Sequence, residues 1–266
     1  MVGLPGPSIP RVRIAGITAA LACVGMAYHR FLRPRMLRWG ISQEEARVPL
    51  PGDERVPDPY SGNNSTHAIT IDAPPGTVWP WIVQIGHTRA GWYTHDWVER
   101  LLGVRYAEGH SATRIHPEFQ QLRIGDRIPY SPLNSIPVVT VEPEQYLIIG
   151  NTVAWVLQDL GDGRTRLIVR TRGYGWIRSL FRKIPVLREI GAAIDYVIGE
   201  PLHHYMEKGM CLGIARRAEA QRQVLPNAGP LPARTLRAGD RKLSSSLLSR
   251  PQVVRRETGV LRPLAP

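Results

Sequence analysis

The densest group of polar and aromatic side chains in this sequence is the segment 89–97, RAGWYTHDW. An arginine can hold the polar or anionic end of a ligand, and tryptophan and tyrosine rings can line an apolar cavity beside it. A tryptophan in a later predicted strand can face the same cavity. We therefore predict a ligand-binding site made of Arg89, Trp92, Tyr93, Asp96, Trp97 and Trp155.

A purely structural interpretation of the same residues stays open. In it, the tryptophans pack in the core, Asp96 stabilises the first turn of a short helix, and Arg89 pairs with Asp96. Trp155 lies in the middle of a predicted strand, and the alternation of that strand does not decide which face the indole takes.

Catalytic motifs are missing from the sequence as a whole. The chain has no nucleophile elbow, no phosphate-binding glycine loop and no dinucleotide fingerprint. Four histidines fall between positions 87 and 116 without forming a tight metal-ligand pair, and the adjacent His203 and His204 point in different directions on a predicted helix. We therefore expect no metal and no cofactor, and a binding protein in preference to an enzyme.

The positive charge of the chain is concentrated at its two ends. Residues 1–40 contain six arginines and no acidic residue, whereas residues 227–266 contain eight basic and two acidic residues. The 186 residues between them are balanced, with 20 basic and 20 acidic side chains. Because a nucleic-acid binder usually carries its basic residues on the folded domain, we expect an anionic membrane surface as the partner and no nucleic acid. Solvated ends without a partner are the alternative.

An uncharged run of fifteen residues, 14–28, lies inside the basic N-terminus 1–40. With its apolar neighbours it reaches the roughly 20 residues that a membrane-spanning helix needs. We therefore predict a membrane-anchor helix at about 12–32. A secretory signal peptide lacks a convincing cleavage site here, and a buried amphipathic helix lacks a polar face. More arginines follow the run than precede it, so we expect a single-pass membrane protein with its domain on the cytoplasmic side.

The rest of the chain divides into a linker, one folded domain and a tail. We predict a linker at 41–62, which is rich in proline, glycine and charge, a domain at 63–223, and a disordered basic tail at 224–266. Hydrophobic periodicity predicts helices near 78–86, 94–103 and 186–223, the last interrupted at Gly199–Pro201. It predicts strands at 65–72, 126–130, 137–142, 145–150, 152–159 and 165–172.

The short connections between these strands indicate an antiparallel sheet in an α+β fold. Gly161-Asp162-Gly163, between the last two strands, is a strong hairpin signal. Such a sheet must cover its apolar face, and the only long element available is the last helix. A cavity for an apolar ligand is expected between the sheet and this helix.

Several stretches of the chain resemble the START-like or SRPBCC superfamily, which has the helix-grip fold. The nearest resemblance is to bacterial membrane-anchored SRPBCC-family proteins of unassigned function, and it covers about 38–222. The stretches that carry it are Ile69–Asp72 with Ala73-Pro74-Pro75, Val78-Trp79-Pro80-Trp81, Gln84-Ile85-Gly86, Arg89–Tyr93 with Asp96-Trp97, Arg114–Glu118 with Leu122 and Gly125-Asp126, and Met206–Glu219. Thr113 and Phe119 depart from the pattern, where Asp and Trp are expected.

The resemblance implies a curved antiparallel sheet wrapped around the long C-terminal helix, with a hydrophobic cavity between them. We therefore predict a membrane-tethered domain that binds a lipid or another hydrophobic small molecule. One alternative is a polyketide cyclase or aromatase, with Tyr93, Asp96 or His95 as acid or base. Another is a structural or regulatory membrane protein whose core is filled by its own side chains.

Overall fold

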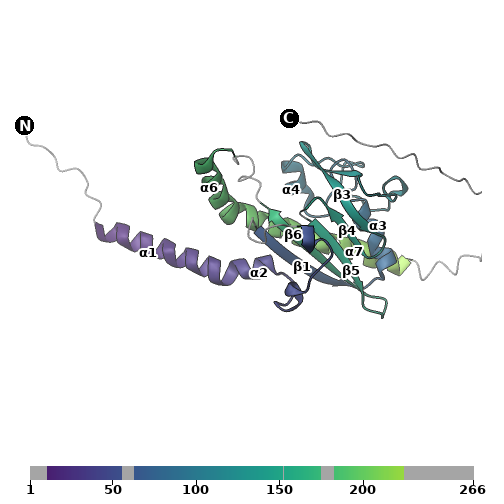
Figure 1. The fold of residues 1–266 in the computed structure, drawn as a ribbon, viewed down its shortest axis with the longest axis horizontal. Helices are drawn as coiled ribbons and strands as arrows, with labels where there is room; N and C mark the ends of the chain where they lie inside the picture. The colour runs from purple at the N-terminus through teal and green to yellow at the C-terminus, as the bar shows by residue number, and fades with distance from the viewer. Residues whose placement is uncertain (1–10, 56–62, 152, 175–182, 225–266) are drawn as a thin grey trace, which may run out of the picture. The chain divides into compact units, whose positions relative to one another are not determined.

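A six-stranded antiparallel sheet forms the centre of the fold (Figure 1). The computed structural model describes residues 11–55, 63–151, 153–174 and 183–224. The strands follow the spatial order β1-β6-β5-β4-β3-β2, so β1 and β2 lie at the two edges. Their bounds are β1 Asn63–Ile71, β2 Arg127–Ser131, β3 Asn134–Glu142, β4 Tyr146–Ile149, β5 Val153–Asp159 and β6 Thr165–Tyr174.

Each consecutive pair from β2 to β6 is a hairpin, as the short connections predict. In the turn between β5 and β6, Gly161 and Gly163 both have a φ of +78°, a conformation that glycine adopts without the steric cost of a Cβ. The first strand, β1, pairs with the last strand, β6, and so forms the edge opposite β2.

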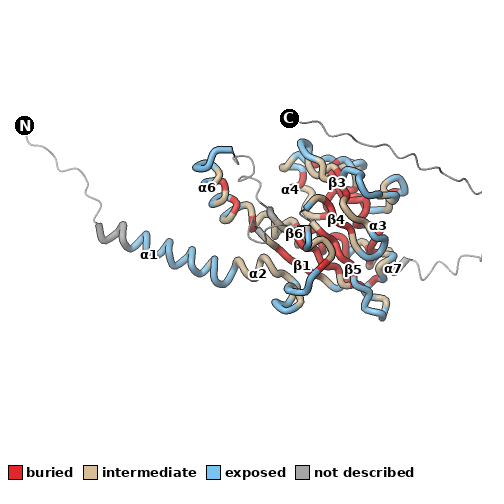
Figure 2. The backbone as a smooth tube through the Cα atoms, viewed as in Figure 1, coloured by how far each residue is buried: buried red, intermediate tan, exposed pale blue. Residues whose placement is uncertain are grey.

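The inner face of the sheet is covered by two helices, α3 (Pro75–Val83) and α7 (Glu200–Val224), which also contact each other. Side chains in register across the strands define this face, because directly paired residues point the same way. One such row is His67, Val169, Trp155, Leu147 and Val141. Figure 2 shows the buried residues gathered in the sheet and in the helices against it.

Two glycines allow α7 to approach the chain very closely at residues 93–94. A Cβ on Gly213 would lie 2.0 Å from the carbonyl oxygen of Tyr93, and one on Gly209 would lie 2.8 Å from the hydroxyl of Thr94. Only a residue without a side chain fits at such a crossing. The spacing of four residues places both glycines on one side of the helix.

The outer face of the sheet is covered by the segment that precedes β1. This segment contains the short helical turns η2 (Glu45–Arg47) and η3 (Asp53–Arg55). A small apolar cluster of Leu50, Ala68, Val156 and Ile168 lies beneath it, with Ile41 and Tyr146 at its margin. Arg166 and Arg170 of β6 also point to this side, where they pair with Glu45 and Asp53. The described part of the predicted linker 41–62 therefore lies against the sheet.

The prediction of a single membrane-spanning helix at the N-terminus, with the domain on the cytoplasmic side, is wrong. In the described part of the chain, no helix has both the length and the apolarity to cross a bilayer. The helix α1 (Arg11–Ala27) has 17 residues and ends at a π-helical turn, η1 (Tyr28–Leu32), followed by α2 (Arg33–Leu37). Charged and prolyl residues from Arg30 onward limit the apolar run.

The end of this N-terminal segment contacts protein. Arg33 makes two hydrogen bonds to Glu200 at the start of α7, with nitrogen–oxygen distances of 2.6 and 2.8 Å. The hydroxyl of Tyr28 donates to the carbonyl of Tyr196, which lies in a second π-helical turn, η5 (Asp195–Gly199). Tyr28, which falls within the predicted membrane helix at 12–32, therefore has a partner 168 positions away.

The α+β fold, the antiparallel sheet and the long C-terminal helix are confirmed. The predicted interruption at Gly199–Pro201 corresponds to η5, which separates α6 (Pro185–Ile194) from α7. The helix predicted near 94–103 is α4 (Asp96–Leu101). Almost all of the predicted tail, and residues 56–62 of the predicted linker, lie outside the described residues, so the predicted domain division stays a prediction.

Candidate ligand-binding site

Three of the six predicted site residues, Arg89, Trp92 and Tyr93, lie on a constrained loop between α3 and α4, whereas Asp96 and Trp97 begin α4 and Trp155 lies in β5. Gly86, Thr88, Gly91 and Tyr93 all have positive φ, at +133°, +57°, +80° and +59°. For Thr88 and Tyr93 this conformation is strained, at a cost of about 1–3 kcal/mol each. The strain persists because hydrogen bonds on both sides hold the loop, including one from the Thr88 amide to the carbonyl of Arg105.

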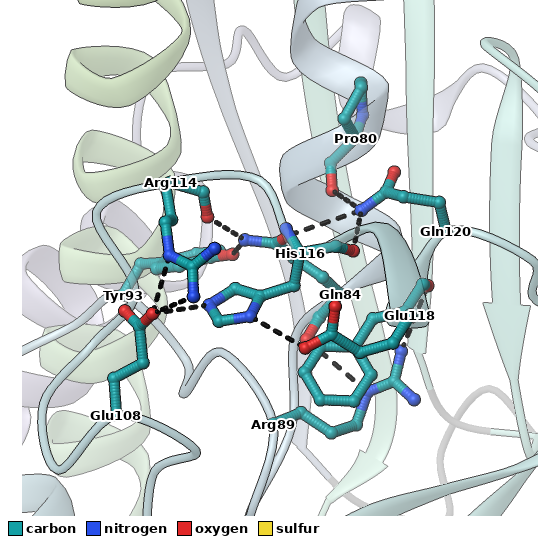
Figure 3. A network of polar contacts seen from close by, with 10 residues as sticks. Pro80, Gln84, Arg89, Tyr93, Glu108, Arg114, His116, Glu118 and Gln120 are labelled. Atoms are coloured by element: carbon teal, nitrogen blue, oxygen red, sulfur yellow. Dashed lines mark hydrogen bonds and ion pairs between the residues drawn. The ribbon is translucent and has the colours of Figure 1, made fainter.

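Gln84, at the end of α3, is the centre of the polar network that holds this loop (Figure 3). Its buried amide nitrogen donates to the Tyr93 hydroxyl at 2.8 Å and to the Arg114 carbonyl at 3.1 Å. Its amide oxygen accepts from the His116 backbone at 2.9 Å and from the Gln120 side chain at 3.2 Å. All four hydrogen-bonding positions of this amide are thus satisfied, and they join α3 to the long loop after α4.

The side chain of Arg89 caps the C-terminal end of α3. Its guanidinium donates to the carbonyls of Val83 and Ile85, at 2.7 and 3.1 Å, and lies over the ring of Phe119 at 4.5 Å. The last carbonyls of a helix lack partners within the helix, and a cationic side chain satisfies them well. Arg89 is therefore already occupied by protein acceptors, and it does not pair with Asp96 as the structural interpretation expected.

Trp92 and Tyr93 are buried, on different sides of the loop. The Tyr93 ring lies edge-on to Trp81 at 6.0 Å and beneath the guanidinium of Arg217 at 4.5 Å. Burial raises the pKa of Tyr93 above its usual range, although the hydrogen bond from Gln84 opposes this. The Trp92 ring packs against Tyr130 of β2 at 4.9 Å.

Asp96 and Trp97 lie outside the apolar core, in the first turn of α4. Asp96 accepts a hydrogen bond of 2.7 Å from the hydroxyl of Ser111, which fastens α4 to the following loop. Trp97 is 66% exposed. These two residues do not share the enclosed environment of Tyr93.

Trp155 lies on the inner face of the sheet, a choice that alternation left open. It is 1% exposed and belongs to the same apolar core as Tyr93 and Trp92. Its indole N–H is buried and has no hydrogen-bond acceptor among the described residues. An indole N–H that is removed from water normally donates a hydrogen bond, so this buried donor still requires an acceptor.

A second buried polar group, which the sequence interpretation missed, joins β1 to α7. The carboxylate of Glu207 lies 2.7 Å from His67 Nδ1 and 3.2 Å from His203 Nε2. It also accepts hydrogen bonds from the hydroxyls of Ser65 and Thr171, at 2.9 and 2.7 Å. The four-residue spacing of His203 and Glu207 on a helix was a usable signal, because such residues share a face.

The contacts among His67, His203, His204 and Glu207 determine which of these side chains are charged. Burial alone would lower the pKa of His67, but the charge of Glu207 and a hydrogen bond to it raise that pKa. Burial alone would raise the pKa of Glu207, but His203 and His67 hold it well below its usual range. The adjacent His204, whose Nδ1 lies 3.3 Å from His67 Nε2, has its pKa lowered to about 4 by burial and by the charge of His67. The cluster is therefore a buried ion pair beside a neutral histidine, and no metal-binding group of three or more ligands forms among the described residues.

Two pockets among the described residues lie on the outer face of the sheet. The larger, of about 250 Å³, is lined by Leu37, Arg38, Gln43, Ala46, Arg47, Asn64, Ser65, Thr66, Arg170 and Arg172, and we call it the arginine pocket. The smaller, of about 10 Å³, lies beside it around Asp53 and Ile148. Neither is between the sheet and α7, where the ligand cavity was expected.

Comparison with known proteins gives no match to a protein-family model and no match among curated proteins. Solved structures that are similar include a polyketide cyclase-like protein from Corynebacterium glutamicum, at 15% identity and a TM-score of 0.28 over 60% of this chain and 94% of that one. A conserved protein of unknown function from Enterococcus faecalis has 14% identity and a TM-score of 0.24 over 63% and 86%. CalU16 from Micromonospora echinospora has 16% identity and a TM-score of 0.24 over 65% and 93%.

These likenesses concern the fold alone, and at such TM-scores no argument about function rests on them. The architecture itself has the arrangement that the START-like resemblance implies, an antiparallel sheet with a long C-terminal helix against its inner face. The chain is an α+β protein with a six-stranded antiparallel sheet and a long C-terminal helix.

Proposed function

We propose that this chain binds an uncharged apolar molecule, such as a lipid, between the inner face of the sheet and α7. The observation that carries the proposal is the indole N–H of Trp155, which has no acceptor among the described residues and belongs to a ring that is 1% exposed in the apolar core. A ligand with one acceptor atom on an apolar body would satisfy this donor and lose little by leaving water. The START-like arrangement of sheet and helix supports the same conclusion.

The interior around Trp155 has the composition that an apolar ligand needs. Across the strands, Trp155 lies opposite Val169 and Leu147, and Met210 of α7 belongs to the same core. In the absence of a ligand these side chains pack together. Methionine is flexible enough to move aside, so a ligand would displace Met210 before it displaces the rigid rings. Trp92 and Tyr93 belong to the same core as Trp155. Ligand contacts by all six predicted residues, Arg89, Trp92, Tyr93, Asp96, Trp97 and Trp155, stay a prediction.

The test compares two ligands that differ only in the acceptor. The full chain is titrated with the uncharged fluorophore N-phenylnaphthylamine, which is then displaced by methyl laurate or by an alkane of equal length. We expect the ester to bind more tightly than the alkane by about tenfold, the worth of one buried hydrogen bond. In the variant Trp155→Phe, which keeps the ring and loses the N–H, this preference should disappear.

The control is Trp97→Phe, which makes the same change on an exposed ring and should keep the preference for the ester. If the chain binds neither the fluorophore nor the ester, the interior is a filled core and the proposal is wrong. If the ester preference survives in Trp155→Phe, a ligand site exists but the Trp155 donor does not form it.

One observation favours the alternative function, an enzyme of the cyclase type. Tyr93 has a buried hydroxyl in the same core as Trp155, and this hydroxyl could act as a general acid toward a bound substrate. Any apolar compound that copurifies with the chain should then be converted on incubation, as a change in its mass. The conversion should stop in Tyr93→Phe; a passenger recovered unchanged argues for binding alone.

A further inference from the structure

The arginine pocket presents four guanidinium groups in a small volume. Arg38 and Arg47 come from the N-terminal segment, and Arg170 and Arg172 come from β6. Its other lining residues are neutral, so no described acid lines it. We propose that this pocket binds a phosphate group carried by a phosphomonoester. The inference goes beyond the apolar ligand proposed above, because the pocket lies on the opposite face of the sheet.

Arg170 forms the fixed base of the pocket. Its side chain is 4% exposed and lies 2.5 Å from Asp53 through Nη1. It also donates to the carbonyl of Ala46 at 2.8 Å and to the hydroxyl of Thr66 at 3.2 Å. These contacts hold the guanidinium in one orientation before any ligand arrives, which reduces the entropy lost on binding.

Arg172 has a hydrogen-bonding position left over. Its Nη2 lies 2.9 Å from the second oxygen of Asp53, so that a single carboxylate serves two arginines. Its Nε is buried and has no acceptor among the described residues. A buried donor without a partner is costly, and a second anion in the pocket would satisfy it.

Arg38 and Arg47 complete the site with charges that the described protein does not neutralise. The only side-chain contact of Arg38 within that part of the chain is a 3.3 Å hydrogen bond to the carbonyl of Pro34. Arg47 is exposed, and its guanidinium makes no hydrogen bond or ion pair with another described residue. Among the described residues, these four arginines are paired with a single carboxylate, that of Asp53, which leaves an excess of three positive charges.

The excess charge favours phosphate over carboxylate as the ligand group. A phosphomonoester carries close to two negative charges near neutral pH and offers three oxygens, whereas a carboxylate carries one charge and two oxygens. Guanidinium groups match phosphate oxygens in pairs of parallel hydrogen bonds. A volume of about 250 Å³ leaves room beside the phosphate for a small organic part, next to Leu37 and Ala46.

The experiment measures binding to the full chain by isothermal titration calorimetry with glycerol 3-phosphate, and with acetate at equal ionic strength. A second arm measures cosedimentation with phosphatidic acid vesicles, whose headgroup is also a phosphomonoester. The variant is Arg38→Gln with Arg47→Gln, because these residues have few contacts and should leave the fold intact. The control is Arg123→Gln with Arg216→Gln, two exposed arginines outside the pocket that give the same change in net charge.

We expect glycerol 3-phosphate to bind, acetate not to bind, and the pocket variant to lose at least about tenfold in affinity while the control keeps it. Binding only to the vesicles, lost in the pocket variant, would assign the phosphate to a lipid headgroup. The proposal is overturned if neither phosphomonoester binds, or if the pocket variant and the control bind equally well. Thermal unfolding of both variants checks that each is folded.

Discussion

His67 of β1 and Glu207 of α7 form an ion pair of 2.7 Å in which both side chains are almost completely buried. It joins the edge of the sheet to the helix that covers it. The Nε2 atom of the His67 ring lies 2.7 Å from the carbonyl oxygen of Met36, so the N-terminal segment also contacts His67. Three parts of the chain that are distant in sequence therefore depend on one charged pair.

Replacing Glu207 with Gln should lower the free energy of unfolding by about 3–5 kcal/mol, because a buried charge network loses its central partner. The measurement is urea denaturation at pH 7. Glu189→Gln is the control, since Glu189 is an exposed residue of α6 and its replacement should change stability by less than about 0.5 kcal/mol. Equal stability of the wild type and Glu207→Gln would mean that the pair contributes nothing.

Stability should pass through a maximum close to pH 6.5. The pKa of His67 is raised above its ordinary value of 6.5, so its contribution is complete below that value and is lost as the pH rises through the folded pKa. The pKa of His204 is lowered to about 4, so the unfolded chain binds a proton more readily between pH 6.5 and 4, and stability falls across that window. Urea midpoints from pH 4 to 9 test both limbs.

The variant His204→Asn separates the two limbs of this profile. It removes the histidine that resists protonation, so the decline between pH 6.5 and 4.5 should flatten while the alkaline limb remains. Below pH 4.5 a further decline is expected in both proteins, because the low pKa of Glu207 makes its contribution vanish as the pH falls through that pKa. An unchanged acidic limb in His204→Asn would contradict this assignment.

Gly213→Ala should destabilise the protein by about 3 kcal/mol or more, since overpacking at a rigid contact is costly. The new Cβ would lie 2.0 Å from the Tyr93 carbonyl oxygen, a backbone atom that cannot move independently. Gly25→Ala is the matched control, because a Cβ there meets nothing within 4 Å and alanine favours the helix. Thermal unfolding of both variants should separate them clearly; similar melting temperatures would place α7 farther from the loop.

Gln84→Glu should lower the free energy of unfolding by about 2–4 kcal/mol, because two donated hydrogen bonds are lost and a carboxyl group is buried. The Tyr93 hydroxyl and the Arg114 carbonyl lose their partner, so the loop after α4 should also become more susceptible to limited proteolysis. Gln121→Glu makes the same chemical change at an exposed neighbour and should have little effect. Equal proteolysis of the two variants would show that the network does not hold the loop.

The helices and strands of this fold could be predicted from short stretches of sequence. The strand predicted at 165–172 is β6 (Thr165–Tyr174), because apolar and polar residues alternate there at the period of a pleated strand. The helical interruption predicted at Gly199–Pro201 is also present. By contrast, the uncharged N-terminal run 14–28 led to a wrong prediction of a membrane-spanning helix, because composition does not show that Tyr28 and Arg33 have protein partners.

The candidate site was predictable only in part, for the same reason. Segment 89–97 was identified from its density of aromatic and polar residues, but the acceptors of Arg89 are carbonyls at the end of α3, and no pattern of residue types predicts them. The spacing of His203 and Glu207 was visible in the sequence, whereas their meeting with His67 depends on where α7 crosses β1.

The order of the strands and helices, the hairpin at Gly161–Gly163 and the position of the last helix against the sheet are all predictable from the amino-acid sequence. These follow from local periodicity and turn chemistry, which act over a few residues. The tertiary structure alone decided that Trp155 faces inward, that Arg170 and Arg172 face the N-terminal segment, and that Glu207 meets His67. In β5 the residues from Val153 to Leu157 are apolar on both faces, so only the packing of distant segments gives each face its environment.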